Sequence, residues 1–218
     1  MKYKAVLLDA DDTIFDFKAS ERSAFTRTAE HFGFSPELYP TYHRINDGLW
    51  KALERGEVTK DRLRVKRYEL LSEEAGLSYD PKEVTEYYSD RLAEGYFLMD
   101  GAIELLEELR GKLAVYLCTN GVSEVQRSRI AGTGIAPYLD GVFISEELGA
   151  EKPKKEFYDR VFERIPYEKS QVIAFGDSPS SDIKGAARYG IDSCIFRGES
   201  DLATYRVTEL KKFLEVIK

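Results

Sequence analysis

The chain has 218 residues, of which 43% are hydrophobic and 33% charged, a composition that lets a globular protein bury a substantial core. Its formal net charge of -7 argues against a general nucleic-acid binder, which needs a basic surface to displace phosphate counterions. Two cysteines are too few for a disulfide framework, the N-terminal apolar run is too short for a signal peptide, and no segment approaches the length that spans a bilayer. We therefore expect a cytoplasmic protein without nucleic-acid or membrane partners.

The first expected element is a buried strand at residues 6–8, which ends abruptly in Asp9-Ala10-Asp11-Asp12-Thr13. Carboxylates this close together repel one another unless a cation is near. In an extended segment Asp9 and Asp11 point to the same side, so together they could bind one divalent cation through oxygen ligands. A surface turn with a capping aspartate is the alternative interpretation.

From about residue 19 to residue 96 the pattern indicates helix after helix. The expected helices span roughly residues 19–32, 36–55, 59–75 and 81–95, separated by Gly, Pro and Ser. Thr59 and the segment 78–81 look like helix starts. Because no strand interrupts these helices, we predict an inserted helical subdomain.

From residue 100 onward strands and helices alternate. We expect helices at 102–110, 123–131, 155–164, 182–189 and 209–217, and strands at 113–118, 142–145, 172–175 and 193–196. Continuously apolar strands that alternate with helices predict a parallel sheet covered on both faces. The expected fold class is therefore α/β, with a core domain of residues 1–16 and 99–218 and a helical domain of residues 17–98.

Polar residues follow several of these strands, at the edge where open parallel sheets bind ligands. The hydroxyl of Thr119 and the amides of the turn Thr119-Asn120-Gly121 can bind an anion, although this is also an ordinary turn sequence. Lys152, held just before Pro153, is a candidate for a fixed positive charge, although a charge run of this kind is often solvated.

The last of these loops runs from Gly176 to Asp182. Gly176 permits a turn, and Asp177 emerges from a buried strand as a possible metal ligand. Asp182 either caps the next helix or supports the site, and the sequence leaves both roles open.

The loops together contain the parts of a phosphoryl-transfer site. Asp9, Asp11 and Asp177 supply oxygen ligands for a metal, while Thr119 and Lys152 supply hydrogen-bond donors and positive charge for a neighbouring anion. One carboxylate can then serve as nucleophile.

With these motifs the chain resembles the haloacid dehalogenase superfamily of phosphohydrolases. The resemblance rests on Asp9-x-Asp11-x-Thr13, Thr119, Lys152 and Gly176-Asp177-x-x-x-x-Asp182, in that order and each after an expected strand. It covers almost the whole chain and implies a Rossmann-like, doubly wound parallel sheet with a small helical cap. The segments 9–17, 119–121 and 144–147 further resemble a branch of cytoplasmic 5'-nucleotidases that act on pyrimidine and noncanonical nucleoside monophosphates.

The resemblance implies a role for each matching residue. Asp9 would be the nucleophile that forms an aspartyl-phosphate, and Asp11 the general acid and then base. The implied phosphate-binding residues are Thr119, Asn120 and Lys152; the implied Mg²⁺ ligands are Asp9, the backbone carbonyl of Asp11, and Asp177; Thr13, Gly176 and Asp182 would support them. Asp12 would have no part in the chemistry and would support the turn.

Substrate choice would then lie in the cap. Trp50 could stack on a base and Arg55 could meet a phosphate or carbonyl, or Trp50 could pack inside the cap with Arg55 solvated. His31 and His43 lie away from the motifs, and we expect no catalytic role for them.

The expected function is a Mg²⁺-dependent phosphomonoesterase whose substrate is a small phosphorylated metabolite, a nucleoside monophosphate being favoured. A phosphatase of sugar phosphates, a β-phosphoglucomutase-like phosphomutase and a non-enzymatic phospho-ligand binding module are the alternatives. A dehalogenase is disfavoured, because it would need neither Asp11 nor the metal site at Asp177. The sequence leaves open whether the protein is a monomer or a homodimer.

Overall fold

The computed structural model describes residues 2–218, and the chain divides into two compact units. One unit holds the chain up to Phe17 together with Tyr96–Lys218, and the other holds Lys18–Gly95. The first boundary lies one residue after the expected one and the second lies three residues before it. No helix in residues 2–218 is both long and apolar enough to cross a membrane.

A parallel sheet forms the centre of the first unit, which confirms the expected α/β fold class. The strands are β1 (Ala5–Leu8), β2 (Ala114–Thr119), β3 (Gly141–Ile144), β4 (Val172–Gly176), β5 (Asp192–Phe196) and β6 (Tyr205–Val207), in the order β3-β2-β1-β4-β5-β6. Leu8, the last residue of β1, lies opposite Leu117 of β2 and Phe175 of β4. The loops that follow these three strands therefore begin side by side.

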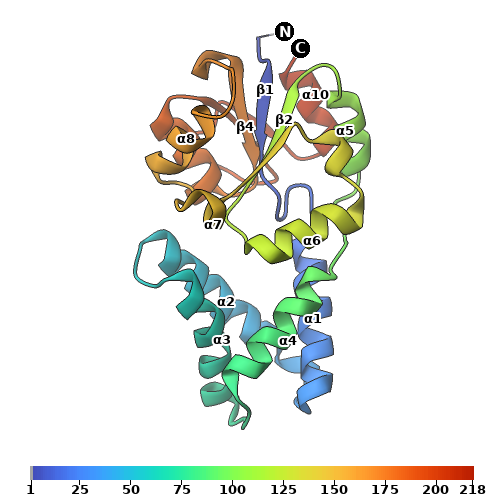
Figure 1. Cartoon of the computed structure of the whole chain (residues 1–218), viewed down its shortest axis with the longest axis vertical. Helices are drawn as coiled ribbons and strands as arrows, with labels where there is room; N and C mark the ends of the chain where they lie inside the picture. Colours follow the sequence, from blue (N-terminus) through green and yellow to red (C-terminus); the bar gives the residue numbers. More distant parts are fainter. Residues whose placement is uncertain (1) are drawn as a thin grey trace. The chain divides into compact units, whose positions relative to one another are not determined.

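Helices cover both faces of this sheet, because alternate residues of each strand face opposite ways. The helices of this unit are α5 (Ala102–Leu109), α6 (Ser123–Thr133), α7 (Ser145–Leu148), α8 (Lys155–Phe162), α9 (Lys184–Tyr189) and α10 (Phe213–Val216). Val6 and Leu8 belong to the apolar cluster that includes α5 and α10, whereas Leu7 belongs to the cluster that includes α8 and α9. Figure 1 shows α5 and α10 on one side of β1 and β2, with α8 on the other.

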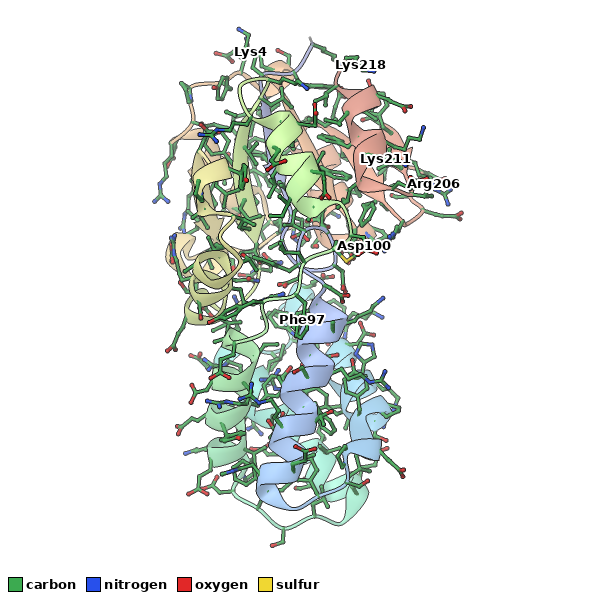
Figure 2. All side chains as sticks on the ribbon, turned by 90° about the vertical axis from the view of Figure 1, so that its right-hand side faces the viewer. Lys4, Phe97, Asp100, Arg206, Lys211 and Lys218 are labelled. Carbon is green, nitrogen blue, oxygen red and sulfur yellow. The ribbon has the colours of Figure 1, made fainter. Side chains whose placement is uncertain are left out.

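The direction of β1 fixes which end of this unit carries the loops with polar residues. Figure 2 shows Lys4, just before β1, and Lys218 at one end of the unit and Asp100 at the opposite end. Because β1 starts beside Lys4 and the other strands run parallel to it, their carboxyl ends point away from Lys4.

Several elements differ from the expected ones. Strand β6 was not expected, and Ser145 begins the short helix α7 instead of ending a strand. The expected helix at 209–217 consists of a 3-10 turn, Leu210–Lys212, followed by α10. Its periodicity still identifies the residues that pack inward, since Leu210, Phe213 and Ile217 are buried.

The second unit is helical, as the sequence predicts. It is formed by α1 (Phe17–Phe32, from Lys18 onward), α2 (Tyr39–Glu54), α3 (Lys60–Ala75) and α4 (Pro81–Ala93). The Thr59 and Asp80 side chains accept hydrogen bonds at the starts of α3 and α4, the cap positions that the sequence indicates. Inside the unit, the buried guanidinium of Arg67 lies 4.4 Å from the ring centre of Tyr88.

Candidate active site

The loop after β1 is a tight turn. The backbone N–H groups of Ile14 and Phe15 both donate to the carbonyl of Ala10, at 2.9 and 2.8 Å. Asp12 has a φ of 57°, a left-handed conformation that aspartate tolerates better than most residues. The turn leaves Asp9 at the end of the strand while the following residues turn back.

Lys152 connects the separate loops of the site. Its ammonium group donates to Oδ1 of Asp9 at 2.6 Å, to Oδ1 of Asp182 at 2.6 Å and to the carbonyl of Cys118 at 2.7 Å, which uses all three of its hydrogens. Burial alone would favour the neutral amine, but Asp182 and Asp9 together raise the pKa of Lys152 well above its ordinary value. Lys152 is thus the fixed positive charge that the sequence indicates.

Asn120 positions Lys152 through its backbone. Its side-chain amide donates to the carbonyl of Lys152 at 2.8 Å and accepts from the N–H of Lys152 at 2.9 Å. We expected Asn120 among the phosphate-binding residues, and the structure instead pairs this amide with a peptide group. An asparagine amide can do this because it offers one donor and one acceptor in the same geometry as the backbone.

The loop after β4 brings Asp182 toward Lys152. A Cβ atom on Gly176 would lie 2.3 Å from Oδ2 of Asp182, so only glycine leaves room for this carboxylate. The same Oδ2 accepts from the backbone N–H of Ser178 at 3.1 Å. Ser178 itself caps the helical segment Pro179–Ile183, so of the two roles that the sequence left open for Asp182, the structure has the contact with Lys152.

Three carboxylates gather beside Lys152. Oxygens of Asp9, Asp177 and Asp182 all lie within 4.8 Å of one another. Burial, followed by repulsion from Asp182, raises the pKa of Asp9 well above its ordinary value, although Lys152 opposes the shift. Burial and then the charges of Asp182 and Asp12 raise the pKa of Asp177 to about 7.

The cluster fits a hard divalent cation. Lys152 balances one of the three negative charges, which leaves two for a cation to neutralise. Carboxylate oxygens are the ligands that Mg²⁺ takes from proteins. Thr13, an expected supporting residue, is fully buried, and its hydroxyl lies 3.5 Å from Oδ1 of Asp177.

The carboxylate of Asp11 lies outside this cluster, which corrects our first interpretation of Asp9 and Asp11 as two side chains on one cation. Its Oδ1 accepts from Nη1 of Arg129 at 2.5 Å, and its Oδ2 accepts from Nε2 of Gln126 at 2.5 Å. The reversal of the chain at Asp12 makes this possible, because residues 9 to 12 do not continue as an extended strand.

Thr119, at the end of β2, is almost completely buried and offers one hydroxyl. Its Oγ1 accepts from the N–H of Gly121 and from Nε2 of Gln126, both at 3.0 Å. With both lone pairs occupied, the O–H can donate to an anion.

Gln126 and Arg129 are not among the residues that the sequence motifs indicate. Both lie on the expected helix at 123–131, three residues apart and therefore on one face. The apolar residues Val125 and Ile130 are buried beside them. The available signal was two polar residues on the buried face of a helix that follows the turn predicted to bind phosphate.

Trp50 and Arg55 lie in the helical unit. Trp50 is partly buried on α2. Arg55 follows this helix and forms an exposed two-pronged ion pair with Glu57, at 2.6 and 2.7 Å. A contact of either side chain with substrate stays a prediction.

Comparison with known proteins agrees with this fold. The family of haloacid dehalogenase-like hydrolases matches residues 3–190. The HAD-hydrolase YfnB of Bacillus subtilis is 34% identical over 99% of this chain and 96% of its own. A crystal structure of YfnB bound to magnesium superposes with a TM-score of 0.94 at 33% identity and covers both chains completely.

Two further relatives are nucleotidases. The pyrimidine 5'-nucleotidase PynA of Streptococcus pneumoniae is 34% identical over 88% of this chain and 83% of its own. The pyrimidine 5'-nucleotidase YjjG of Escherichia coli is 32% identical over 89% of this chain and 86% of its own.

The fold defines a protein of the α/β class with a helical insertion, and an acidic, lysine-containing cluster lies where β1, β2 and β4 end. The chain belongs to the haloacid dehalogenase-like hydrolase family. It is a phosphomonoester hydrolase, in agreement with its nucleotidase relatives and with the expectation from the sequence.

Proposed function

We propose that the protein is a Mg²⁺-dependent 5'-nucleotidase that acts through an aspartyl-phosphate on Asp9. The observation that carries the proposal is the buried ion-pair network in which Lys152 joins Asp9 and Asp182 beside Asp177. Such a network holds a nucleophilic carboxylate next to a fixed cation, at the place where a phosphoryl group would bring further negative charge.

In the proposed reaction, an oxygen of Asp9 attacks phosphorus while the bond from phosphorus to the leaving oxygen breaks. Asp11 gives a proton to that oxygen, and the nucleoside leaves. Water then attacks the aspartyl-phosphate, Asp11 takes back a proton, and inorganic phosphate is released with the Asp9 carboxylate restored. Thr119 would donate a hydrogen bond to a phosphoryl oxygen, and the charge of Lys152, held beside Asp9, would attract the phosphoryl group.

The metal would be bound by Asp9 and Asp177 together with the backbone carbonyl of Asp11, with Asp182 beside them. When bound, Mg²⁺ would neutralise the charge of the transferring phosphoryl group. The YfnB crystal structure, described as bound to magnesium, supports this choice of ion.

The favoured substrate is a nucleoside monophosphate, because two relatives of this chain are pyrimidine 5'-nucleotidases.

We also propose a reducing, cytoplasmic location. Cys118 and Cys194 are both free and buried, which suits such a compartment.

A phosphate-release screen tests the proposal. Purified protein with Mg²⁺ is assayed on nucleoside monophosphates and sugar phosphates, beside the variant Asp9→Asn. We expect the highest kcat/KM on a nucleoside monophosphate and a loss of roughly 10⁵-fold or more in Asp9→Asn, as when other enzymes lose a nucleophile. A higher kcat/KM on a sugar phosphate would show that the preferred substrate is a sugar phosphate and not a nucleotide. Isomerised sugar phosphate without free phosphate would indicate a mutase. Binding without turnover would reject an enzymatic function.

A further inference from the structure

We propose that Arg129 and Gln126, on α6, are positioning residues that hold the Asp11 carboxylate in the orientation for proton exchange with the leaving group. The inference deepens the proposed function and rests on it, since it takes Asp11 to be the acid and base. It goes beyond it by assigning a catalytic contribution to two residues that lie outside the motifs of the sequence.

Arg129 and Asp11 form an ion pair in which only Asp11 is exposed to solvent. The Arg129 side chain is completely buried, whereas 27% of the Asp11 side chain is exposed. A guanidinium keeps its charge at any working pH, and a buried charge is strongly unfavourable unless it is paired. Arg129 is therefore held against Asp11 from the protein side, while the exposed part of Asp11 stays open to a ligand.

Stacking fixes the direction of the guanidinium. It lies 4.3 Å from the ring centre of Phe15, which is completely buried and closes the turn after β1. An arginine stacked on an aromatic ring has little freedom to swing, and a planar fork donates in a defined direction. The carboxylate that it binds is oriented with it.

Gln126 binds the other oxygen of Asp11 and ties it to the phosphate-binding turn. Its Nε2 donates to Oδ2 of Asp11 at 2.5 Å and to Oγ1 of Thr119 at 3.0 Å. Its Oε1 is buried and has no hydrogen-bond partner among residues 2–218, so both donor hydrogens of Gln126 are used in the site while its acceptor is not. The amide spans the distance from the proposed acid to the proposed phosphate ligand.

Gly121 makes the approach of Gln126 possible. A Cβ atom at this position would lie 2.2 Å from Nε2 of Gln126, closer than any side chain permits. The turn Thr119-Asn120-Gly121 thus leaves room for an amide that contacts Asp11. Together Gln126 and Arg129 bind both carboxylate oxygens from one helix of 11 residues, and rotation of the Asp11 carboxylate would break both contacts.

The test compares two leaving groups. A nucleoside alkoxide needs a proton to leave, whereas p-nitrophenolate leaves without one, and kcat/KM reports only the steps up to formation of the aspartyl-phosphate. Because general acid catalysis contributes about 10²–10⁴-fold, Arg129→Met and Gln126→Leu should lower kcat/KM on the best nucleoside monophosphate by roughly 30-fold or more. On p-nitrophenyl phosphate we expect a loss of about threefold or less. Arg129→Lys, which keeps the charge, should recover part of the nucleotide activity.

Arg127→Met is the matched control. Arg127 lies on the same helix, is 51% exposed and pairs with Glu147, so its loss should change neither substrate's kcat/KM. Equal losses on both substrates in Arg129→Met and Gln126→Leu, or no loss in either variant, would overturn the positioning role. If either Arg129→Met or Gln126→Leu does not fold, the ratio of the losses on the two substrates in the other variant tests the positioning role. The proposed function fails separately, when the unaltered enzyme releases no phosphate or Asp9→Asn remains active.

Discussion

At the scale of single residues, the site depends on a few close approaches that only one residue type permits. Lys152 is surrounded by two carboxylates and one carbonyl, and each of the three comes from a different segment of the chain. The network has no spare donor on Lys152, so a small displacement of any partner changes the position of the ammonium group. Glycines that leave room for those partners are therefore as important as the charged groups.

Gly176→Ala tests this argument. Its Cβ would lie 2.3 Å from Oδ2 of Asp182, so Asp182 must move away from Lys152. Because misplacement of a catalytic group by about 1 Å can cost 10²-fold, we expect kcat/KM to fall by roughly 10- to 100-fold while far-ultraviolet circular dichroism stays unchanged. Wild-type kcat/KM in this variant would contradict the proposed role of Asp182.

A second residue-scale prediction concerns Asp192, at the start of β5. Its Oδ2 accepts from Lys2 at 2.5 Å and from the hydroxyl of Tyr3 at 2.7 Å, and these hydrogen bonds lower the pKa of Asp192 below its ordinary value of 3.8. A lowered pKa stabilises the fold above about pH 4, and this contribution is lost as the pH falls through the lowered pKa.

Asp192→Asn should therefore lower the free energy of unfolding at pH 7 by about 0.5–1 kcal/mol, the magnitude of a partly screened pair. Urea titrations from pH 7 down to pH 3 should show the difference from wild type shrinking toward the acid end. The exposed Asp201 provides the control, since Asp201→Asn should change stability little at any pH. A difference that stays constant with pH would reject the assignment.

Some residues of the site could be predicted from the sequence, and others could not. Asp9 and Asp177 were identifiable because each directly follows an apolar strand, and Lys152 because it lies in the segment between β3 and α8; these positions bring all three to one edge of a parallel sheet. The contacts of Asn120 and Arg129 were not, because their partners lie 32 and 118 residues away along the chain. Side-chain pairs of this kind are set by tertiary packing, which local patterns do not encode.

At the scale of elements, periodicity predicted the long helices and apolar strands well and the short elements poorly. Strand β6 has three residues and helix α7 has four, too few for a period to repeat. For the expected helix at 209–217, the periodicity correctly predicted that Leu210, Phe213 and Ile217 face inward, but the first turn is 3-10 and not α-helical. The sequence therefore predicted which side chains of this segment are buried better than it predicted whether the backbone forms α-helical or 3-10 hydrogen bonds.

Helix α2 provides a prediction at this scale. Gly48 lies in its interior, and a Cβ added there meets nothing within 4 Å. Since glycine within a helix costs roughly 0.5–1 kcal/mol relative to alanine, Gly48→Ala should raise the free energy of unfolding by about that amount. Gly56 has a φ of +76°, so Gly56→Ala should instead destabilise the protein. Urea denaturation of both variants checks the opposite signs, and equal signs would contradict the helix argument.

At the scale of the whole molecule, the acidic cluster is a local concentration of negative charge in a chain whose formal net charge is already -7. The raised pKa values of Asp9 and Asp177, caused first by burial, indicate carboxylates that are unfavourably placed as anions. A cation that binds only the folded cluster should stabilise the entire core unit, because ligand binding and folding are linked.

Mg²⁺ should therefore raise the melting temperature. At a free concentration 100 times Kd the linkage is worth about 2.7 kcal/mol, and a chain of this size gains roughly 2–4 °C per kcal/mol, so we expect a rise of about 5–10 °C. Differential scanning calorimetry with Mg²⁺ and then with excess chelator should show the rise and its reversal. Asp177→Asn should lose the rise, whereas Asp192→Asn, outside the cluster, should keep it. The same rise in Asp177→Asn would place the bound ion elsewhere, because this variant removes one of the three carboxylates that form the cluster.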